Sequence, residues 1–194
     1  MATIRFITHP DVLLDPAVPV PDWPLSPTGR ARMQAGLRQQ WVRDIGAIWC
    51  STERKAIDGA EILAAATGLG FTPLSTLGEN DRSATGYLPR AEFEATANDF
   101  FAHPERSIRG WERAIDAQRR IVAALDTILA ATPAAHDIAI VAHGGVGTLL
   151  LCALETLPIS RAHDQPPGQG GYYFAVDRTT RLLRHGWERF DQAR

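Results

Sequence analysis

The sequence has few cysteines and no long hydrophobic run. Cys50 and Cys152 are its two cysteines. They lie far apart and neither belongs to a Cys-x-x-Cys pair, so the usual signals of a zinc site and of a disulfide framework are missing. No segment reaches the roughly 18 uncharged apolar residues of a membrane span, and the N-terminus lacks the apolar stretch of a secretory signal. We therefore expect a cytoplasmic protein with two buried, reduced thiols.

A strong charge of either sign is also lacking. Lys and Arg number 20 against 22 Asp and Glu, which leaves a net charge of −2. This balance provides no electrostatic attraction for nucleic acid or an anionic membrane, so a small soluble ligand is the expected partner. The 194 residues, 45% of them hydrophobic, show no internal repeat or low-complexity tract. Residues 1–194 are predicted to form a single domain around one sizeable core.

Short apolar runs alternate with segments of helical periodicity. This alternation predicts a three-layer α/β/α sandwich with a mostly parallel sheet. Ser26 is a candidate N-cap, with Pro27 at the first helical position, and Gly68 is placed to end a second helix. Strands are expected at 4–8, 45–51, 138–142 and 171–176, and helices from 27 to about 41, from 54 to 67 and between 111 and 129.

The C-terminal part predicts an antiparallel hairpin at the edge of the sheet. Two strand-like runs flank the turn residues Asp177 to Thr180. An exposed edge strand near Tyr172 and Phe174 would allow pairing with a second copy, so a homodimer is possible.

Two histidines stand at the ends of predicted strands. His9 ends the first apolar run, and His143 ends the run "IAIVA" and precedes Gly144 and Gly145. In open α/β sheets ligands bind beyond the carboxyl ends of the strands, so both imidazoles are expected at one crevice. The glycines would allow backbone amides at the next helix to approach an anion. This arrangement points to phosphate chemistry.

At this point the sequence resembles the histidine phosphatase superfamily, whose members include phosphoglycerate mutase-like enzymes. "IRFITHP" is similar to the family's first strand with its Arg-His-Gly signature, and "PLSPTGRARMQA" to its Leu-Thr-x-x-Gly helix start. "WCSTERKAIDGAEILA" is similar to Ser-Pro-x-x-Arg-Ala-x-Gln-Thr-Ala, and "LGEND" to the Leu-x-Glu that supplies an acid. "GWERAIDAQRRI" resembles a Gly-Glu-Ser stretch, and "IVAHGG" is close to Val-Ser-His-Gly-Gly. The six segments occur in the family's order.

The resemblance implies hydrolysis of a small phosphomonoester in two steps. His9 would attack phosphorus to give a phosphohistidine, and Glu79 would protonate the leaving oxygen and then activate water. His143 would stabilise the transferred phosphoryl group. No metal and no cofactor are implied, and the second phosphate site of a mutase has no counterpart in the sequence.

The sequence departs from the family pattern around the phosphate. Thr8 replaces the first arginine, Pro10 the neighbouring glycine, and Asp15 the pocket asparagine, where it would repel a dianion. Lys55 aligns best with the second arginine, with Arg54 as the rival, although Arg54 also has the spacing to pair with Asp58 on a helix. An ammonium group is a point charge and lacks the two-pronged donor geometry of a guanidinium.

Phosphate ligands are therefore expected among Thr8, Arg54, Lys55, Gly144 and Arg113. Arg109 and Arg82 are further candidates for a compensating cation from the opposite side of the pocket. The pocket walls are expected from "DVLLDPAVPVPDWP", "ENDRSATGYLP" and "RAHDQPPGQGG".

Two other interpretations of the two histidines stay open. One is a catalytically weak or inactive family member that binds a phosphate-bearing small molecule. The other is a metal-dependent hydrolase in which His9, His143 and an acid are ligands. The remaining histidines are predicted to be solvated surface residues: His103, His136, His163 and His185.

Overall fold

The computed structural model describes residues 2–192. Its centre is a six-stranded sheet with the strand order β3-β2-β4-β1-β5-β6. The strands are β1 (Thr3–Thr8), β2 (Ile45–Cys50), β3 (Phe71–Pro73), β4 (Asp137–Ala142), β5 (Tyr172–Asp177) and β6 (Leu183–Arg189). The helices are α1 (Pro27–Gly36), α2 (Arg54–Thr67), α3 (Arg90–Ala102), α4 (Ala114–Ala131) and α5 (Gly144–Leu154).

Parallel strands make up the middle of the sheet. β4 pairs in parallel with β1 and with β2, and β1 pairs antiparallel with β5 on its other side. β1 and β4 are buried on both faces, which explains why their sequences are apolar at nearly every position. The predicted mixed α/β sandwich is confirmed.

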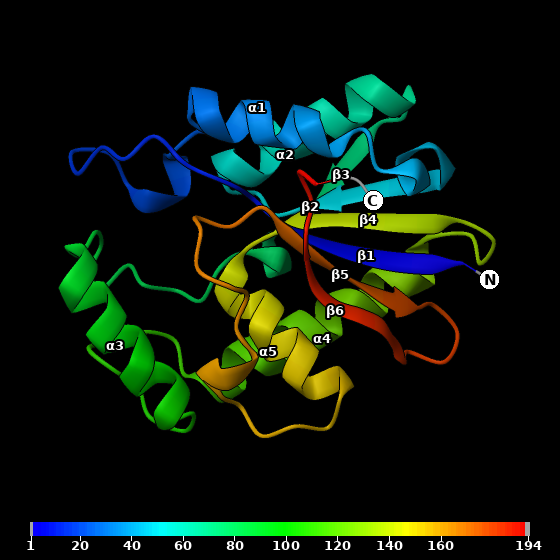
Figure 1. Cartoon of the computed structure of the whole chain (residues 1–194). Coiled ribbons are helices and arrows are strands. Elements are labelled where there is room, and N and C mark those ends of the chain that lie inside the picture. Colours follow the sequence, from blue (N-terminus) through cyan, green and yellow to red (C-terminus); the bar gives the residue numbers. More distant parts are fainter. Residues whose placement is uncertain (1, 193–194) are drawn as a thin grey trace.

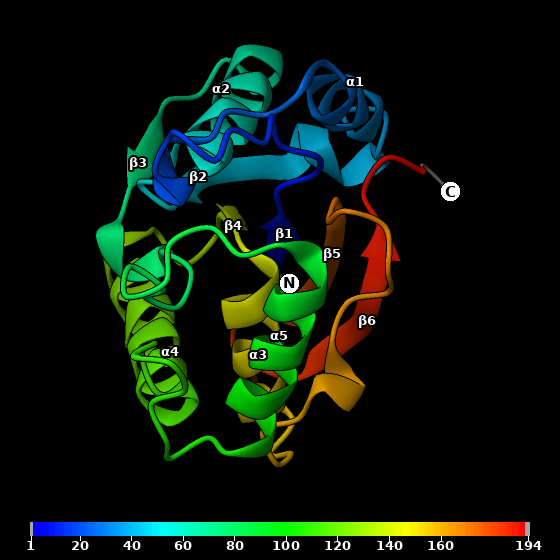
Figure 2. The same cartoon turned by 90° about the vertical axis from the view of Figure 1, so that its left-hand side faces the viewer.

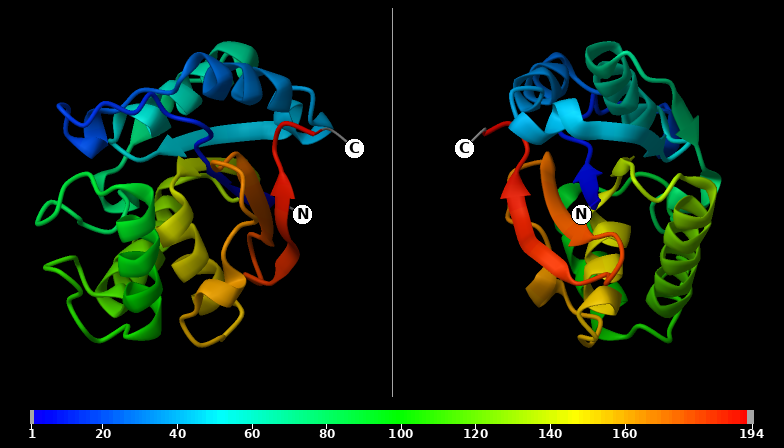
Figure 3. Two further views of the ribbon diagram at one scale, coloured as in Figure 1. Left: turned by 60° about the vertical axis from the view of Figure 1, so that its left-hand side comes forward. Right: turned by 90° about the vertical axis from the view of Figure 1, so that its right-hand side faces the viewer.

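Helices cover both faces of the sheet (Figure 1), and alternate strand residues pack against each layer. Ile7 and Val141 point toward α1 and α2, and belong to a core cluster with Met33 of α1. Phe6 and Ile140 belong to the opposite cluster, with the apolar sides of α4 and α5. Figure 3 shows the same two layers from the sides. The two-residue period of the strands thus divides the core between the two helical layers.

The predicted helix ends are confirmed in two places. The Ser26 hydroxyl caps α1 by accepting a hydrogen bond from the Gly29 amide at 3.0 Å. Gly68 follows α2 in the left-handed conformation, with φ of 73°. The expectation that the first helix continues to Trp41 is wrong, because α1 ends at Gly36, where a Cβ would collide with the Phe190 ring.

Two elements were not predicted. β3 has three residues and includes a proline, so it lacks the length and the pattern of a recognisable strand. α3 buries Thr96, Ala97, Phe100 and Phe101, which together with Phe93 recur at helical spacing. In Figure 2, α3 stands in front of α5 on the side of the sheet where β1 and β4 end.

The predicted C-terminal hairpin is confirmed, but its edge strand is β6. β5 is paired with β1 on one side and with β6 on the other. Tyr172 and Phe174 are buried in β5, so they do not lie on the free edge. At this edge of the sheet, a second copy would have to pair with β6.

Candidate functional site

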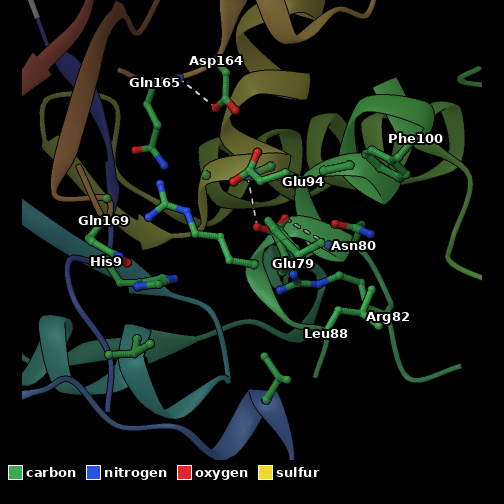
Figure 4. A pocket seen from close by; sticks show the side chains of 18 of the residues that line it. His9, Glu79, Asn80, Arg82, Leu88, Glu94, Phe100, Asp164, Gln165 and Gln169 are labelled. Carbon is green, nitrogen blue, oxygen red and sulfur yellow. Dashed lines mark hydrogen bonds between the residues drawn. The ribbon is translucent and has the colours of Figure 1, made fainter. Parts of the chain in front are cut away.

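A cavity of about 580 Å³ opens beyond the carboxyl ends of β1 and β4. Figure 4 shows His9 and Gln165 on one side of this cavity, and Glu79 and Arg82 on the other. The three segments expected to form the walls do so: they contribute Val12, Leu14, Val20 and Trp23; Glu79, Asn80, Arg82, Gly86, Tyr87 and Leu88; and Arg161 together with residues 164–170.

His9 and His143 meet at this end of the sheet. The two strands that carry them are neighbours, and the His9 amide donates a hydrogen bond to the Ala142 carbonyl at 3.0 Å. The imidazole centroids are 5.2 Å apart and the rings stand edge to face. His9 lines the cavity, whereas His143 is completely buried behind it. The parallel pairing of β1 with β4 therefore brings together two residues 134 positions apart.

Hydrogen bonding and burial keep the His9 ring neutral, with a free lone pair on one nitrogen. Its Nδ1 lies 2.9 Å from the Pro10 carbonyl, which as an acceptor requires a proton on Nδ1 and leaves the Nε2 lone pair free. Burial, and next the Lys55 charge, lower the pKa of His9 from 6.5 to about 4. His9 is therefore neutral at pH 7.

His143 lacks a hydrogen bond at either ring nitrogen. Burial lowers its pKa well below 6.5, although the Glu53 charge opposes the shift. The ring is therefore neutral in the ligand-free protein, and it can serve an anion as a neutral N–H donor. A buried ring whose nitrogens make no hydrogen bond is suited to receive a ligand.

Glu79 joins the loop before α3 to the N-terminus of α5. Its two carboxylate oxygens accept hydrogen bonds from the amides of Gly145 at 3.0 Å and Val146 at 2.9 Å. A negative group at this end of a helix is favoured by the helix dipole. Glu79 also lines the cavity, so its carboxylate is within the same site as His9.

Lys55 is the only lysine in the sequence, and it is buried at this site. Its ammonium group contacts the Glu53 carboxylate at 2.5 Å and donates to the Val20 carbonyl at 2.8 Å. Arg54, the rival candidate, points to the surface and forms the helical pair with Asp58 at 2.8 Å. Of the two cations, Lys55 is the one whose charge acts on both imidazoles.

Thr8 and Gly144 have structural roles that depend on Gln165. The Thr8 hydroxyl donates to the Gln165 amide oxygen at 2.7 Å and accepts from the Tyr172 amide at 3.1 Å. Gly144 lines the cavity, and a Cβ there would lie 2.3 Å from the Gln165 amide nitrogen. Thr8 thus ties the loop 164–171 to β1, and Gly144 leaves room for that loop.

The three candidate arginines are placed differently. Arg82 lines the cavity, and its guanidinium lies over the rings of Phe93 and Trp111 at 5.1 and 5.7 Å. Within residues 2–192 it forms no ion pair. Arg113 and Arg109 lie outside the lining of the cavity and pair with the acids Asp116 and Glu92. Of these three, Arg82 is therefore the one in position to act on a ligand, and Arg90 and Arg161 also line the cavity.

Sequence reasoning missed three residues that shape the site. Glu53 accepts a hydrogen bond from the Glu79 amide at 2.9 Å. Its position two residues before Lys55 was the one sequence signal that could have placed it at the site. Asn80 is buried against the cavity with an unpaired amide nitrogen. Arg120 holds the loop by donating to the carbonyls of Gly78 and Glu79. Only the folded chain brings these groups together.

Several other expectations can be placed. Asp15 is exposed and accepts a hydrogen bond from the Ala17 amide at 2.9 Å, so it does not face the cavity. His103 and His136 are exposed as predicted, while His163 and His185 are half-buried. Between residues 2 and 192, no three His, Cys, Asp or Glu side chains are grouped to hold a metal ion. Among the same residues, no helix combines the length and apolar character needed to cross a bilayer.

The fold is shared with several solved structures, among them two phosphatases. A mycobacterial glucosyl-3-phosphoglycerate phosphatase with inorganic phosphate aligns with a TM-score of 0.75 and 22% identity, over 100% of this chain and 98% of that one. YhfR of Bacillus stearothermophilus aligns with a TM-score of 0.77 and 22% identity, over 99% and 100%. A phosphoserine phosphatase of Entamoeba histolytica aligns with a TM-score of 0.74 and 14% identity, over 97% and 98%. At these identities the similarity establishes the fold.

No curated protein matches the sequence. The model of the histidine phosphatase superfamily (branch 1) matches residues 17–174, most of the chain. Together with the six ordered segments and the pair of facing imidazoles, this match supports phosphatase activity and shows that the chain belongs to the histidine phosphatase superfamily, branch 1.

Proposed function

We propose that the protein is a phosphomonoester hydrolase that acts through a phosphohistidine on His9. The observation that carries the proposal is the pair of imidazoles, 5.2 Å apart, of which His9 lines a cavity that Glu79 also lines. Its substrate is a small phosphorylated molecule.

In the first step His9 acts as the nucleophile. Its Nε2 lone pair forms a bond to phosphorus as the bond from phosphorus to the ester oxygen breaks, and Glu79 in its acid form gives a proton to that oxygen. The lowered pKa of His9, about 4, keeps the lone pair available at neutral pH. The hydrogen bond from Nδ1 of His9 to the Pro10 carbonyl holds the ring in the required tautomer.

In the second step water replaces the histidine. The Glu79 carboxylate takes a proton from water, the water oxygen bonds to phosphorus, and the bond from phosphorus to Nε2 breaks. Inorganic phosphate leaves, and Glu79 is protonated for the next cycle. His143 donates to the transferred oxygens, and the charges of Lys55 and Arg82 offset those of the phosphoryl group.

A second candidate function is binding of a phosphate-bearing molecule with little or no turnover. The contacts of Lys55 and Thr8 favour it. Lys55 is already paired with Glu53, and Thr8 supplies a hydroxyl engaged by Gln165 where the family has an arginine. Losing one charge-assisted hydrogen bond costs about 1.5–3 kcal/mol, which is roughly ten- to a hundredfold in rate.

Release of a chromogenic product from an aryl phosphate separates the two functions. Wild type, His9→Ala and the matched surface variant His103→Ala are compared with and without a chelator. Chelator-resistant release that is lost in His9→Ala alone supports the phosphohistidine mechanism, and acid-labile phosphate trapped on wild type identifies the intermediate.

Other outcomes have equally clear meanings. Absence of release from wild type across pH, with retained binding of inorganic phosphate, favours the binding function. Release that the chelator abolishes contradicts the metal-independent mechanism. Release that survives in His9→Ala rules out His9 as the nucleophile.

A further inference from the structure

Glu53 places a negative charge where a phosphatase site needs positive charge. Its carboxylate contacts the Lys55 ammonium at 2.5 Å and lies 3.3 Å from Nε2 of His143. It also accepts a hydrogen bond from the backbone amide of Glu79 at 2.9 Å. One buried carboxylate therefore touches the lysine, the second histidine and the loop that carries the acid.

These contacts are the ones that a phosphoryl oxygen would make. In the proposed mechanism, an oxyanion held between the two imidazoles takes the ammonium of Lys55 and an N–H of His143 as donors. Glu53 takes up the first and lies against the second. The charge of Lys55, the only lysine, is thereby offset before any ligand arrives.

We infer that Glu53 is a specificity-determining residue whose carboxylate competes with the phosphoryl group of a ligand for Lys55 and His143. The inference rests on the proposed function only in assigning the phosphoryl group to this site. A ligand with little negative charge meets little repulsion from Glu53. A dianion meets about twice the repulsion that a monoanion meets. Glu53 thus sets how much negative charge the site accepts.

Substitution of Glu53 by Gln isolates the charge. Gln retains the length of the side chain and an oxygen that can accept from Lys55 and from the Glu79 amide, so the hydrogen bonds can persist. Removing one negative charge several ångströms from a dianion is expected to tighten binding of inorganic phosphate by roughly ten- to a hundredfold at pH 8. Binding of dimethyl phosphate, a monoanion, is expected to tighten by roughly the square root of that factor.

Binding is measured by calorimetry and by NMR. Because Lys55 is the only lysine, protein labelled with ¹³C-lysine gives one side-chain Cε signal, which reports directly on this ammonium group. Glu61→Gln is the matched control, because Glu61 is an exposed residue of α2, the helix that Glu53 precedes, and the affinity of this variant for phosphate should equal that of wild type. Glu53→Asp keeps the charge, and its affinity should stay within roughly threefold of wild type.

Weaker or unchanged phosphate binding in Glu53→Gln overturns the inference, and weaker binding in both Glu53 variants would identify Glu53 as a residue that merely positions Lys55. Equal effects on phosphate and dimethyl phosphate would also contradict it. Because these measurements require no turnover, an absence of phosphatase activity would refute the proposed function and leave this result standing.

Discussion

Replacing Lys55 by Met tests how strongly the buried ion pair holds the site together. Met is close in length to Lys but has no charge, so Glu53 would remain as a largely buried carboxylate without its ammonium partner. Breaking a buried pair by removing one partner costs about 3–5 kcal/mol. We expect a loss of this size in the free energy of unfolding of Lys55→Met at pH 7.

The pKa of Glu53 gives an independent magnitude. Burial alone would raise this pKa, but the Lys55 charge and the hydrogen bonds from Lys55 and the Glu79 amide help to lower it from 4.5 to about 2. At 1.36 kcal/mol per pKa unit, its partners stabilise the folded protein by about 3 kcal/mol. Because the folded-state pKa is depressed, this contribution is present above pH 4.5 and is lost as the pH falls toward 2. In Lys55→Met the pKa of Glu53 rises, so the remaining contribution is lost at higher pH.

The assay is urea unfolding followed by tryptophan fluorescence. Arg119→Met is the control, since it removes an exposed cation whose partner Asp116 is also exposed, and it should cost less than about 1 kcal/mol. The double variant Lys55→Met with Glu53→Gln removes both charges, and it should recover at least half of the loss. A loss below about 1 kcal/mol in Lys55→Met, or a double variant as unstable as the single one, would refute the reasoning.

Three further perturbations have distinct expected outcomes. Arg82→Ala should lower kcat/KM for an aryl phosphate by roughly tenfold or more. Arg113→Ala, which removes a surface pair, should leave kcat/KM within about twofold of wild type. Equal effects of the two substitutions would contradict the placement of the two arginines. The pKa of His9 is depressed from 6.5 to about 4, so its stabilising contribution is present above pH 6.5 and is lost between pH 6.5 and 4. The free energy of unfolding should therefore fall less over this range in His9→Gln than in wild type, while His103→Gln should keep the wild-type slope. Ser26→Ala removes the cap of α1 and should cost about 1 kcal/mol in thermal unfolding, and an unchanged Tm would show that the cap is dispensable.

Local sequence determined the elements that have a strong pattern. The continuous apolar runs of β1 and β4 predict buried parallel strands, and the pattern Ser26-Pro27 predicts the start of α1, because these signals act over a few residues. The placement of both histidines at one crevice also followed from sequence, since parallel strands end at the same edge of a sheet. α3 was missed although its buried residues recur at helical spacing, because small and polar side chains such as Thr96 and Ala97 make its apolar stripe weak.

Only the tertiary structure decided the charge of the site. From sequence alone, Lys55 and Arg54 were rival cations, and Arg113 was an expected phosphate ligand while Arg82 was only a further candidate. Packing buried Lys55 beside Glu53 and turned Arg54 outward to Asp58. Electrostatic interactions act through space and depend on burial, so the sequence pattern alone cannot rank the candidate charged residues. The sequence by itself thus determined where two imidazoles meet, and the fold determined which charges surround them.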